Sequence, residues 1–296
     1  MGLYYPDYSN SILNISATLA EHLGAPNKNI TLPILTDALK NQHKNVVFIC
    51  FDGLGIYPIQ TNLHENDFLF KNTRQVLRST FPSTTTNATT SFHSNQFPLE
   101  HGWFGWSMHY PSINRNVDIF MNRDSETQEA VHIKESPIHT PEYFFDHPQD
   151  TYEINTVFPS YVVTHHPERN YTFSKISELF SIILSLSQKD GRQFIYAYCP
   201  EPDATMHMEG VKSVSARQMI CMISALVETL CTKLRDTLVI ITADHGQVDM
   251  DGHIELYADD TLMNMLKIYP YLEARVPAFQ VKSGMQEAFA SYFSEK

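Results

Sequence analysis

The sequence predicts an α/β fold with a central, mostly parallel sheet, and three apolar segments carry this prediction. They are NVVFICF (45–51), RQFIYAY (192–198) and LVIIT (238–242). None of them alternates apolar with polar residues, and such continuous runs are typical of strands that are covered on both faces. Helical patterns at 172–188 and 214–235 flank the middle segment. Strands that alternate with helices at this spacing favour an open α/β sheet.

Two further regions precede and interrupt this pattern. Residues 9–24 are expected to form a helix, because apolar residues recur at helical spacing and Gly24 and Pro26 end the pattern. Residues 103–165 are rich in aromatic residues, His, Pro and Asn and contain no long helical pattern. We therefore expect an insertion there, which caps one end of the sheet.

The C-terminal segment is expected to contain a helix near 258–267, a short strand near 276–282 and a final helix from residue 284. A chain of 296 residues with 43% hydrophobic residues is long enough to bury one large core. We therefore expect a single domain over residues 1–296.

Composition excludes several classes of partner. The formal net charge is −12, from 21 basic and 33 acidic residues, and binding to a nucleic acid polymer requires clustered Lys and Arg. The apolar runs are too short to span a bilayer, so no membrane association is expected. The N-terminus has neither a basic region nor a sustained apolar run, which favours a cytoplasmic protein with four reduced cysteines. The oligomeric state is not predicted.

Acidic residues follow all three predicted strands. Because ligands bind at the carboxyl ends of strands in open α/β sheets, Asp52, Asp203 and Asp244 should lie close together. Each Asp alone has a simpler interpretation as a turn former or a helix N-cap. Three clustered carboxylates would repel one another unless a metal ion lay between them. His207 follows Asp203 by four residues and His245 is next to Asp244; Asp and His suit Zn²⁺, and Mn²⁺ also fits.

The segment STFPSTTTNATTSF (79–92) offers a nucleophile. Pro82 and Ser83 suit a helix start and are followed by three threonines. A hydroxyl at a helix N-terminus lies beside free backbone N–H groups, where it is placed to attack phosphorus and to stabilise the developing charge. The alternative is a Ser/Thr-rich helix cap without chemistry.

Together these segments resemble the alkaline phosphatase superfamily, and within it the type I phosphodiesterase/nucleotide pyrophosphatase family. The resemblance implies a three-layer sandwich with a central, mostly parallel sheet and a small inserted cap. It also implies a hydrolase that acts on small phosphorylated substrates, either phosphodiesters or nucleotide-like pyrophosphates. The motifs occur in the order of the family: FDGLG (51–55), TFPSTTTNATTSF (80–92), EHG (100–102), EPDATMH (201–207) and ADHG (243–246).

The resemblance also implies the nucleophile. In the family the nucleophilic hydroxyl lies sixteen residues before the His of the HG motif, and counting back from His101 gives Thr85. Thr84 and Thr80 are weaker candidates. The implied reaction forms a phospho-threonine intermediate, which water then hydrolyses.

Two divalent metal ions are implied as cofactors. One ion would bind Asp52, Asp244, His245 and Thr85, and the other would bind Asp203, His207 and a third His. The family supplies this third His from farther along the chain, and here only His253 follows His245. The predicted metal ligands are thus Asp52, Thr85, Asp203, His207, Asp244, His245 and His253.

The sequence departs from the family at one position that bears on specificity. Many nucleotide pyrophosphatases have an Asn five residues after the His of HG, whereas this chain has Trp106. Specificity for nucleotide pyrophosphates therefore does not follow. A phosphomonoesterase or phosphomutase of the same superfamily, and a non-catalytic binding protein with an incomplete second metal site, remain alternatives. A sulfatase is disfavoured, because PSTTTN lacks the Arg of the formylglycine motif.

Overall fold

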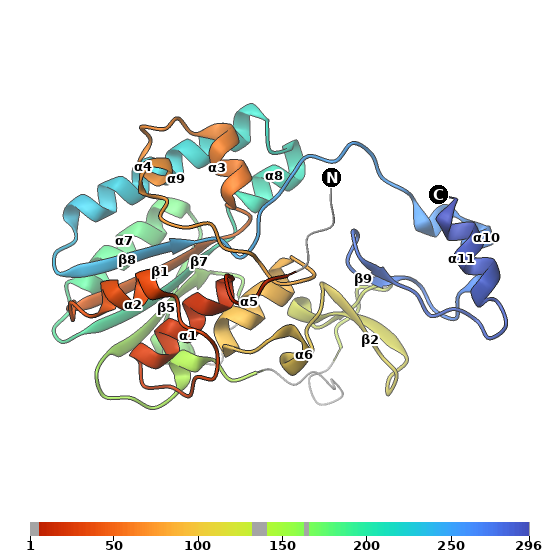
Figure 1. The fold of residues 1–296 in the computed structure, drawn as a ribbon, viewed down its shortest axis with the longest axis horizontal. Coiled ribbons are helices and arrows are strands. Elements are labelled where there is room, and N and C mark those ends of the chain that lie inside the picture. Colours follow the sequence, from red (N-terminus) through yellow and green to blue (C-terminus); the bar gives the residue numbers. More distant parts are fainter. Residues whose placement is uncertain (1–5, 132–140, 163–165, 296) are drawn as a thin grey trace.

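A computed structural model describes residues 6–131, 141–162 and 166–295 (Figure 1). Its centre is a parallel sheet of five strands in the order β6-β5-β7-β1-β8. The three strands predicted from apolar runs are adjacent in this sheet. The strands are β1 (Asn45–Phe51), β5 (Glu153–Pro159), β6 (Asn170–Phe173), β7 (Gln193–Cys199) and β8 (Thr237–Thr242).

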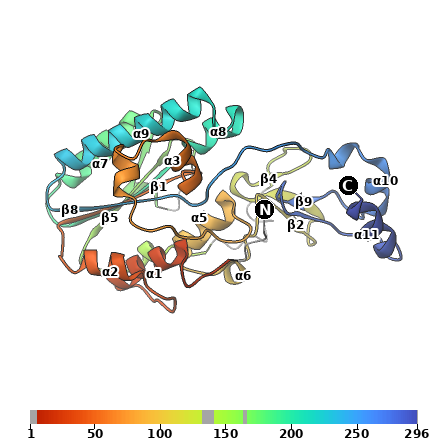
Figure 2. The same ribbon diagram turned by 45° about the horizontal axis from the view of Figure 1, so that its top comes forward.

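Helices cover both faces of this sheet, which confirms the predicted three-layer sandwich (Figures 1 and 2). Alternate residues of β1 enter different cores: Val47 and Ile49 pack on one face, and Val46 and Phe48 pack on the other. One face carries α3 (Ile56–Asn62), α4 (Phe68–Asn72), α7 (Ile176–Ser187), α8 (Asp203–Glu209) and α9 (Val214–Lys233). The other carries α1 (Ile12–His22), α2 (Pro33–Leu39), α5 (Thr85–Ser94) and α6 (Pro98–His101).

A second, antiparallel sheet lies beside the carboxyl edge of the first and combines two distant parts of the chain. Its order is β10-β9-β2-β3-β4, and the C-terminal helices pack at its far end (Figure 2). Its strands are β2 (Ser107–Tyr110), β3 (Arg115–Asp118), β4 (Arg123–Asp124), β9 (Tyr271–Leu272) and β10 (Pro277–Ala278), and the helices are α10 (Asp260–Met265) and α11 (Gln286–Ser294). Short 3₁₀ turns complete the fold at Ile119–Met121, Phe144–Asp146, Pro167–Arg169 and Leu256–Ala258.

The insertion predicted over 103–165 is shorter in the structure, because β5 lies within this range and belongs to the central sheet. The sequence EINTVFP hides this strand, since its polar residues break the apolar pattern. Asn155 is nevertheless buried, with 1% exposure, and its amide donates to Gln193 Oε1 at 2.9 Å. A buried polar side chain with a partner on the adjacent strand is compatible with a central strand.

Element boundaries elsewhere differ by a few residues from those expected. The helix expected over 9–24 is α1, and the helix expected over 172–188 begins only at Ile176, because residues 170–173 form β6. The C-terminal helix, strand and helix are present as α10, β10 and α11, and β10 is only two residues long.

Helix α9 is, among the described residues, the one helix long and apolar enough to span a membrane by length and composition. Its residues Ala216, Ile220, Ile223 and Val227 are buried in the core of the sheet. Packing against a sheet requires the same apolar composition, so the length and composition of α9 are weak evidence for a membrane span.

Candidate active site

Loops at the carboxyl ends of three neighbouring strands bring three aspartates together. Asp52 directly follows β1, Asp244 follows β8, and Asp203 begins α8 after β7. Their exposed fractions are 4%, 0% and 9%. One ligand atom each from Asp52, Asp203 and His245 lie within 4.8 Å of one another. We call Asp52, Thr85, Asp203, Asp244 and His245 the cluster below.

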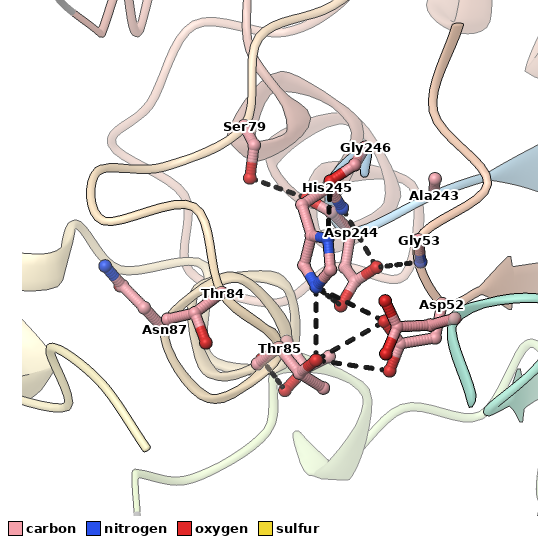
Figure 3. Close-up of polar contacts among 12 residues, drawn as sticks. Asp52, Gly53, Ser79, Thr84, Thr85, Asn87, Ala243, Asp244, His245 and Gly246 are labelled. Atoms are coloured by element: carbon pink, nitrogen blue, oxygen red, sulfur yellow. Dashed lines mark hydrogen bonds and ion pairs between the residues drawn. The ribbon is translucent and has the colours of Figure 1, made fainter. Parts of the chain in front are cut away.

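Thr85 is the candidate hydroxyl that contacts the Asp52 carboxylate and His245 (Figure 3). It is the first residue of α5. Its Oγ1 lies 3.3 and 3.2 Å from the two carboxylate oxygens of Asp52, and 3.2 Å from His245 Nε2. The other two candidate hydroxyls point elsewhere: Thr80 donates to the Pro82 carbonyl, and Thr84 donates to Glu273.

Backbone amides fix the carboxylate of Asp244. Its Oδ1 accepts from the N–H groups of Gly53 at 3.1 Å and of His245 at 2.9 Å. The hydroxyl of Ser79 donates to its carbonyl at 2.6 Å. These contacts turn Oδ2 toward His245 Nε2, which lies 3.6 Å away (Figure 3).

Two buried carboxylate oxygens in the cluster, Asp203 Oδ1 and Asp244 Oδ2, have no hydrogen-bond partner among the described residues. A buried carboxylate oxygen without a partner is costly. Both oxygens are ligands that Zn²⁺ and Mn²⁺ accept, and a cation bound to each would remove the cost. The residues present therefore fit a divalent metal site.

Burial and mutual repulsion shift the pKa values of the cluster. Burial, and next the charge of Asp244, raise the pKa of Asp52 to about 7. Burial, and next the charge of Asp52, raise the pKa of Asp203 to about 6, and burial also raises the pKa of Asp244. Burial alone would lower the pKa of His245, but the carboxylates of Asp244 and Asp52 outweigh it and raise the value to about 9.

These shifts predict how the stability of the metal-free protein depends on pH. Asp52 and Asp203 bind more protons in the folded than in the unfolded state between about pH 4 and pH 7, so stability falls as pH rises through this window. His245 acts in the same direction, because its stabilisation is present below about pH 6.5 and is lost as pH rises through about 9. We expect the Tm of chelator-treated protein to fall between about pH 5 and pH 9 by more than about 2 °C. A Tm that rises over this range in calorimetry would contradict the electrostatics described here.

The two further histidines predicted as ligands differ in their surroundings. His207 Nε2 lies 3.2 Å from Asp203 Oδ2, one turn along α8. His253 is exposed, and its Nε2 contacts Glu255 Oε1 at 3.0 Å. The structure thus brings His207 to the cluster, whereas no contact of His253 with the cluster is seen among the described residues.

Residue 55, in the FDGLG motif, must be glycine for a steric reason, because it lies against the ADHG loop. A Cβ on Gly55 would lie 2.6 Å from the Cα of Gly246 and 3.2 Å from the carbonyl of His245. Real Cβ atoms do not approach backbone so closely. The two loops that carry Asp52 and Asp244 can therefore touch only because residue 55 has no side chain.

Two residues that the sequence does not predict lie at the site: one contacts Asp52 in the cluster, and the other contacts Thr84, which precedes Thr85. The hydroxyl of Tyr198, on β7, donates to Asp52 Oδ2. Glu273, from the C-terminal segment, accepts from Thr84. The register of β1 against β7 pairs Tyr198 with Cys50, but this register is not readable from one sequence. No sequence signal points to Glu273.

Comparisons with known proteins bear on the family and the fold of the chain. A sequence model of the type I phosphodiesterase/nucleotide pyrophosphatase family matches residues 46–292, and no curated protein matches significantly. Murine ectonucleotide pyrophosphatase/phosphodiesterase 5, solved as an inactive threonine-to-alanine variant in complex with AMP, has a TM-score of 0.61 and 19% identity over 83% of this chain and 68% of that chain. The human protein of that name has a TM-score of 0.59 and 16% identity, over 84% and 69%.

At such low identity the two solved structures show that the fold is shared. The family model matches more than half of the chain, from β1 into α11, and so includes both sheets. The chain therefore belongs to the type I phosphodiesterase/nucleotide pyrophosphatase family and is a hydrolase that acts on phosphoric ester bonds.

Proposed function

We propose that the protein hydrolyses small phosphodiesters or nucleotide-like pyrophosphates with two divalent metal ions, through a covalent intermediate on Thr85. The observation that carries this proposal is the position of Thr85 Oγ1, within 3.3 Å of both Asp52 oxygens and of His245 Nε2. The murine relative with AMP bound, inactive as a threonine-to-alanine variant, supports both the nucleophile and the class of substrate.

The residues of the chain have distinct tasks in this reaction. Asp52 and His245 orient the Thr85 hydroxyl. The hydroxyl loses its proton to solvent, and its oxygen forms a bond to phosphorus as the bond from phosphorus to the leaving oxygen breaks. Water then attacks phosphorus, the bond from Thr85 to phosphorus breaks, and a proton from that water restores the Thr85 hydroxyl. The first N–H groups of α5 lack intrahelical acceptors, and no side chain among the residues that the structure describes caps them, so they are available to the phosphoryl oxygens.

Two sets of side chains would hold the metal ions, which are Zn²⁺ in this proposal, with Mn²⁺ as the alternative. Asp52, Thr85, Asp244 and His245 form one set, and Asp203 and His207 begin the other. When bound, such ions act as Lewis acids that stabilise the attacking and leaving oxygens. His253 stays the predicted third ligand of the second set, and it would have to leave Glu255 to bind.

Hydrolysis of two chromogenic esters tests this proposal. With Zn²⁺ or Mn²⁺ added, bis(p-nitrophenyl) phosphate should be hydrolysed, with a higher kcat/KM than p-nitrophenyl phosphate. A higher kcat/KM for the monoester would favour the phosphomonoesterase alternative. If neither ester turned over with either ion, the protein would be a non-catalytic binding protein.

A further inference from the structure

Glu273 connects the second sheet to the helix of the proposed nucleophile. It directly follows β9 and is half-buried. Its Oε1 accepts hydrogen bonds from Thr84 Oγ1 at 2.7 Å and from the backbone N–H of Trp106 at 2.5 Å. Since Thr84 immediately precedes Thr85, the Glu273 carboxylate lies one residue from the proposed nucleophile.

The backbone around Glu273 is strained and tightly packed. Leu272 has a φ of +90°, which side-chain-bearing residues rarely adopt. A Cβ on Gly105 would lie 2.8 Å from the Leu272 carbonyl oxygen and 3.0 Å from Glu273 Cγ. Strain of this kind persists only where surrounding contacts enforce it, and it is concentrated at functional sites. The fold thus holds the Glu273 carboxylate in place by backbone as well as side-chain contacts.

The contact with Glu273 changes what Thr84 does at the start of α5. Thr84 is the N-cap residue, a position where a Thr oxygen commonly accepts from a backbone N–H of the first turn. Here the side chain makes no such bond and donates to Glu273 instead. Within the described part of the chain, the N–H groups of the first turn therefore have no side-chain cap, and the Glu273 carboxylate is bound to the N-cap residue.

We propose that Glu273 is a positioning and specificity-determining residue, which holds Thr84 away from the helix cap and disfavours dianionic phosphomonoesters relative to monoanionic phosphodiesters. This inference rests on the proposed function. Near pH 8 a phosphomonoester carries close to two negative charges, since its second pKa is about 6, whereas a diester carries one. Repulsion from the Glu273 carboxylate, which is bound to the residue before the proposed nucleophile, would act on two charges of the monoester and on one of the diester, a discrimination on the order of tenfold.

Glu273→Gln tests the charge without removing the acceptor, because the Gln carbonyl still accepts from Thr84 and Trp106. We expect kcat/KM to rise for both esters and more for the monoester, so that the ratio of kcat/KM for p-nitrophenyl phosphate to that for bis(p-nitrophenyl) phosphate rises about tenfold. Glu287→Gln is the matched control, since it removes the same charge from an exposed position on α11. It should leave the ratio of the two values unchanged.

Glu273→Ala tests the positioning role. It removes the acceptor as well as the charge, so Thr84 becomes free to cap α5 and kcat for the diester should fall. Restoration of this kcat in Glu273→Gln would show that the loss follows from the missing acceptor. Equal kcat values for the alanine and wild-type proteins would overturn the positioning role.

A binding measurement keeps this inference separate from the proposed function. Calorimetry on the Zn²⁺-loaded protein should show that Glu273→Gln tightens binding of inorganic phosphate more than binding of dimethyl phosphate, so that the ratio of the two affinities rises about tenfold. Unchanged phosphate affinity and an unchanged ratio of ester turnover would overturn the inference and leave the proposed function intact. Absence of ester hydrolysis by the wild type would instead reject the proposed function, and phosphate affinity would still decide the role of Glu273.

Discussion

Thr85→Ala is expected to lower kcat for bis(p-nitrophenyl) phosphate by at least about 10³-fold. Thr85 carries the hydroxyl that contacts both Asp52 and His245. The neighbouring Thr84 hydroxyl is bound to Glu273 and cannot replace it without losing that contact. The loss should appear in steady-state hydrolysis. The variant should still fold, and the metal ion that Thr85 is predicted to bind would have one ligand fewer.

Two matched variants make this prediction specific. Thr85→Ser keeps a hydroxyl and should retain measurable turnover, whereas Thr84→Ala should retain far more activity than Thr85→Ala. Mass spectrometry of rapidly quenched wild-type protein should find the phosphoryl adduct on Thr85. Full activity in Thr85→Ala, or an adduct on Thr80 or Thr84, would show that the nucleophile is assigned wrongly.

Removal of divalent ions by a chelator is expected to abolish turnover, and Asp244→Asn is expected to prevent Zn²⁺ from restoring it. Asp244 is fully buried and its Oδ2 has no hydrogen-bond partner. An asparagine would still accept from the N–H groups of Gly53 and His245 through its Oδ1. The substitution thus removes a metal ligand while it preserves the contacts that hold the loop.

The Asp244→Asn variant also distinguishes a role of Asp244 as a metal ligand from a structural role. Without metal, Asp244→Asn should unfold at the same or a higher temperature than the wild type, because it removes one of several buried like charges. Asp249→Asn is the control: Asp249 lies in the same loop and accepts from the Val211 N–H. It should leave Zn²⁺-dependent turnover intact. Destabilisation of the metal-free Asp244→Asn protein would mean that Asp244 is structural.

Local sequence patterns were sufficient to predict the strands β1, β7 and β8 and the aspartates that follow them. The apolar runs that form β1, β7 and β8 end directly at or near Asp52, Asp203 and Asp244, and all three carboxyl ends meet at one edge of a parallel sheet. The strand β5 was not predicted, because Asn155 is buried through a hydrogen bond to Gln193 on the next strand. Such a partner becomes visible only once strand order is known.

Contacts over long distances in sequence explain the rest of what was missed. Tyr198 reaches Asp52 over 146 residues, and Glu273 reaches Thr84 over 189 residues. Both depend on how separate elements pack, and no residue pattern near Glu273 indicates that its carboxylate lies beside α5. The tertiary position of His253 was likewise not readable, and it lies in an exposed loop beside Glu255.

Anomalous diffraction from crystals loaded with Zn²⁺ tests the central claim most directly, since it locates each ion relative to its ligands. We predict one peak within about 2.0–2.2 Å of ligand atoms of Asp52, Thr85, Asp244 and His245, and a second within the same distance of Asp203 and His207. A peak at His253 would establish the third ligand of the second ion. Zinc bound elsewhere on the protein, with no peak between Asp52 and Asp244, would contradict the account.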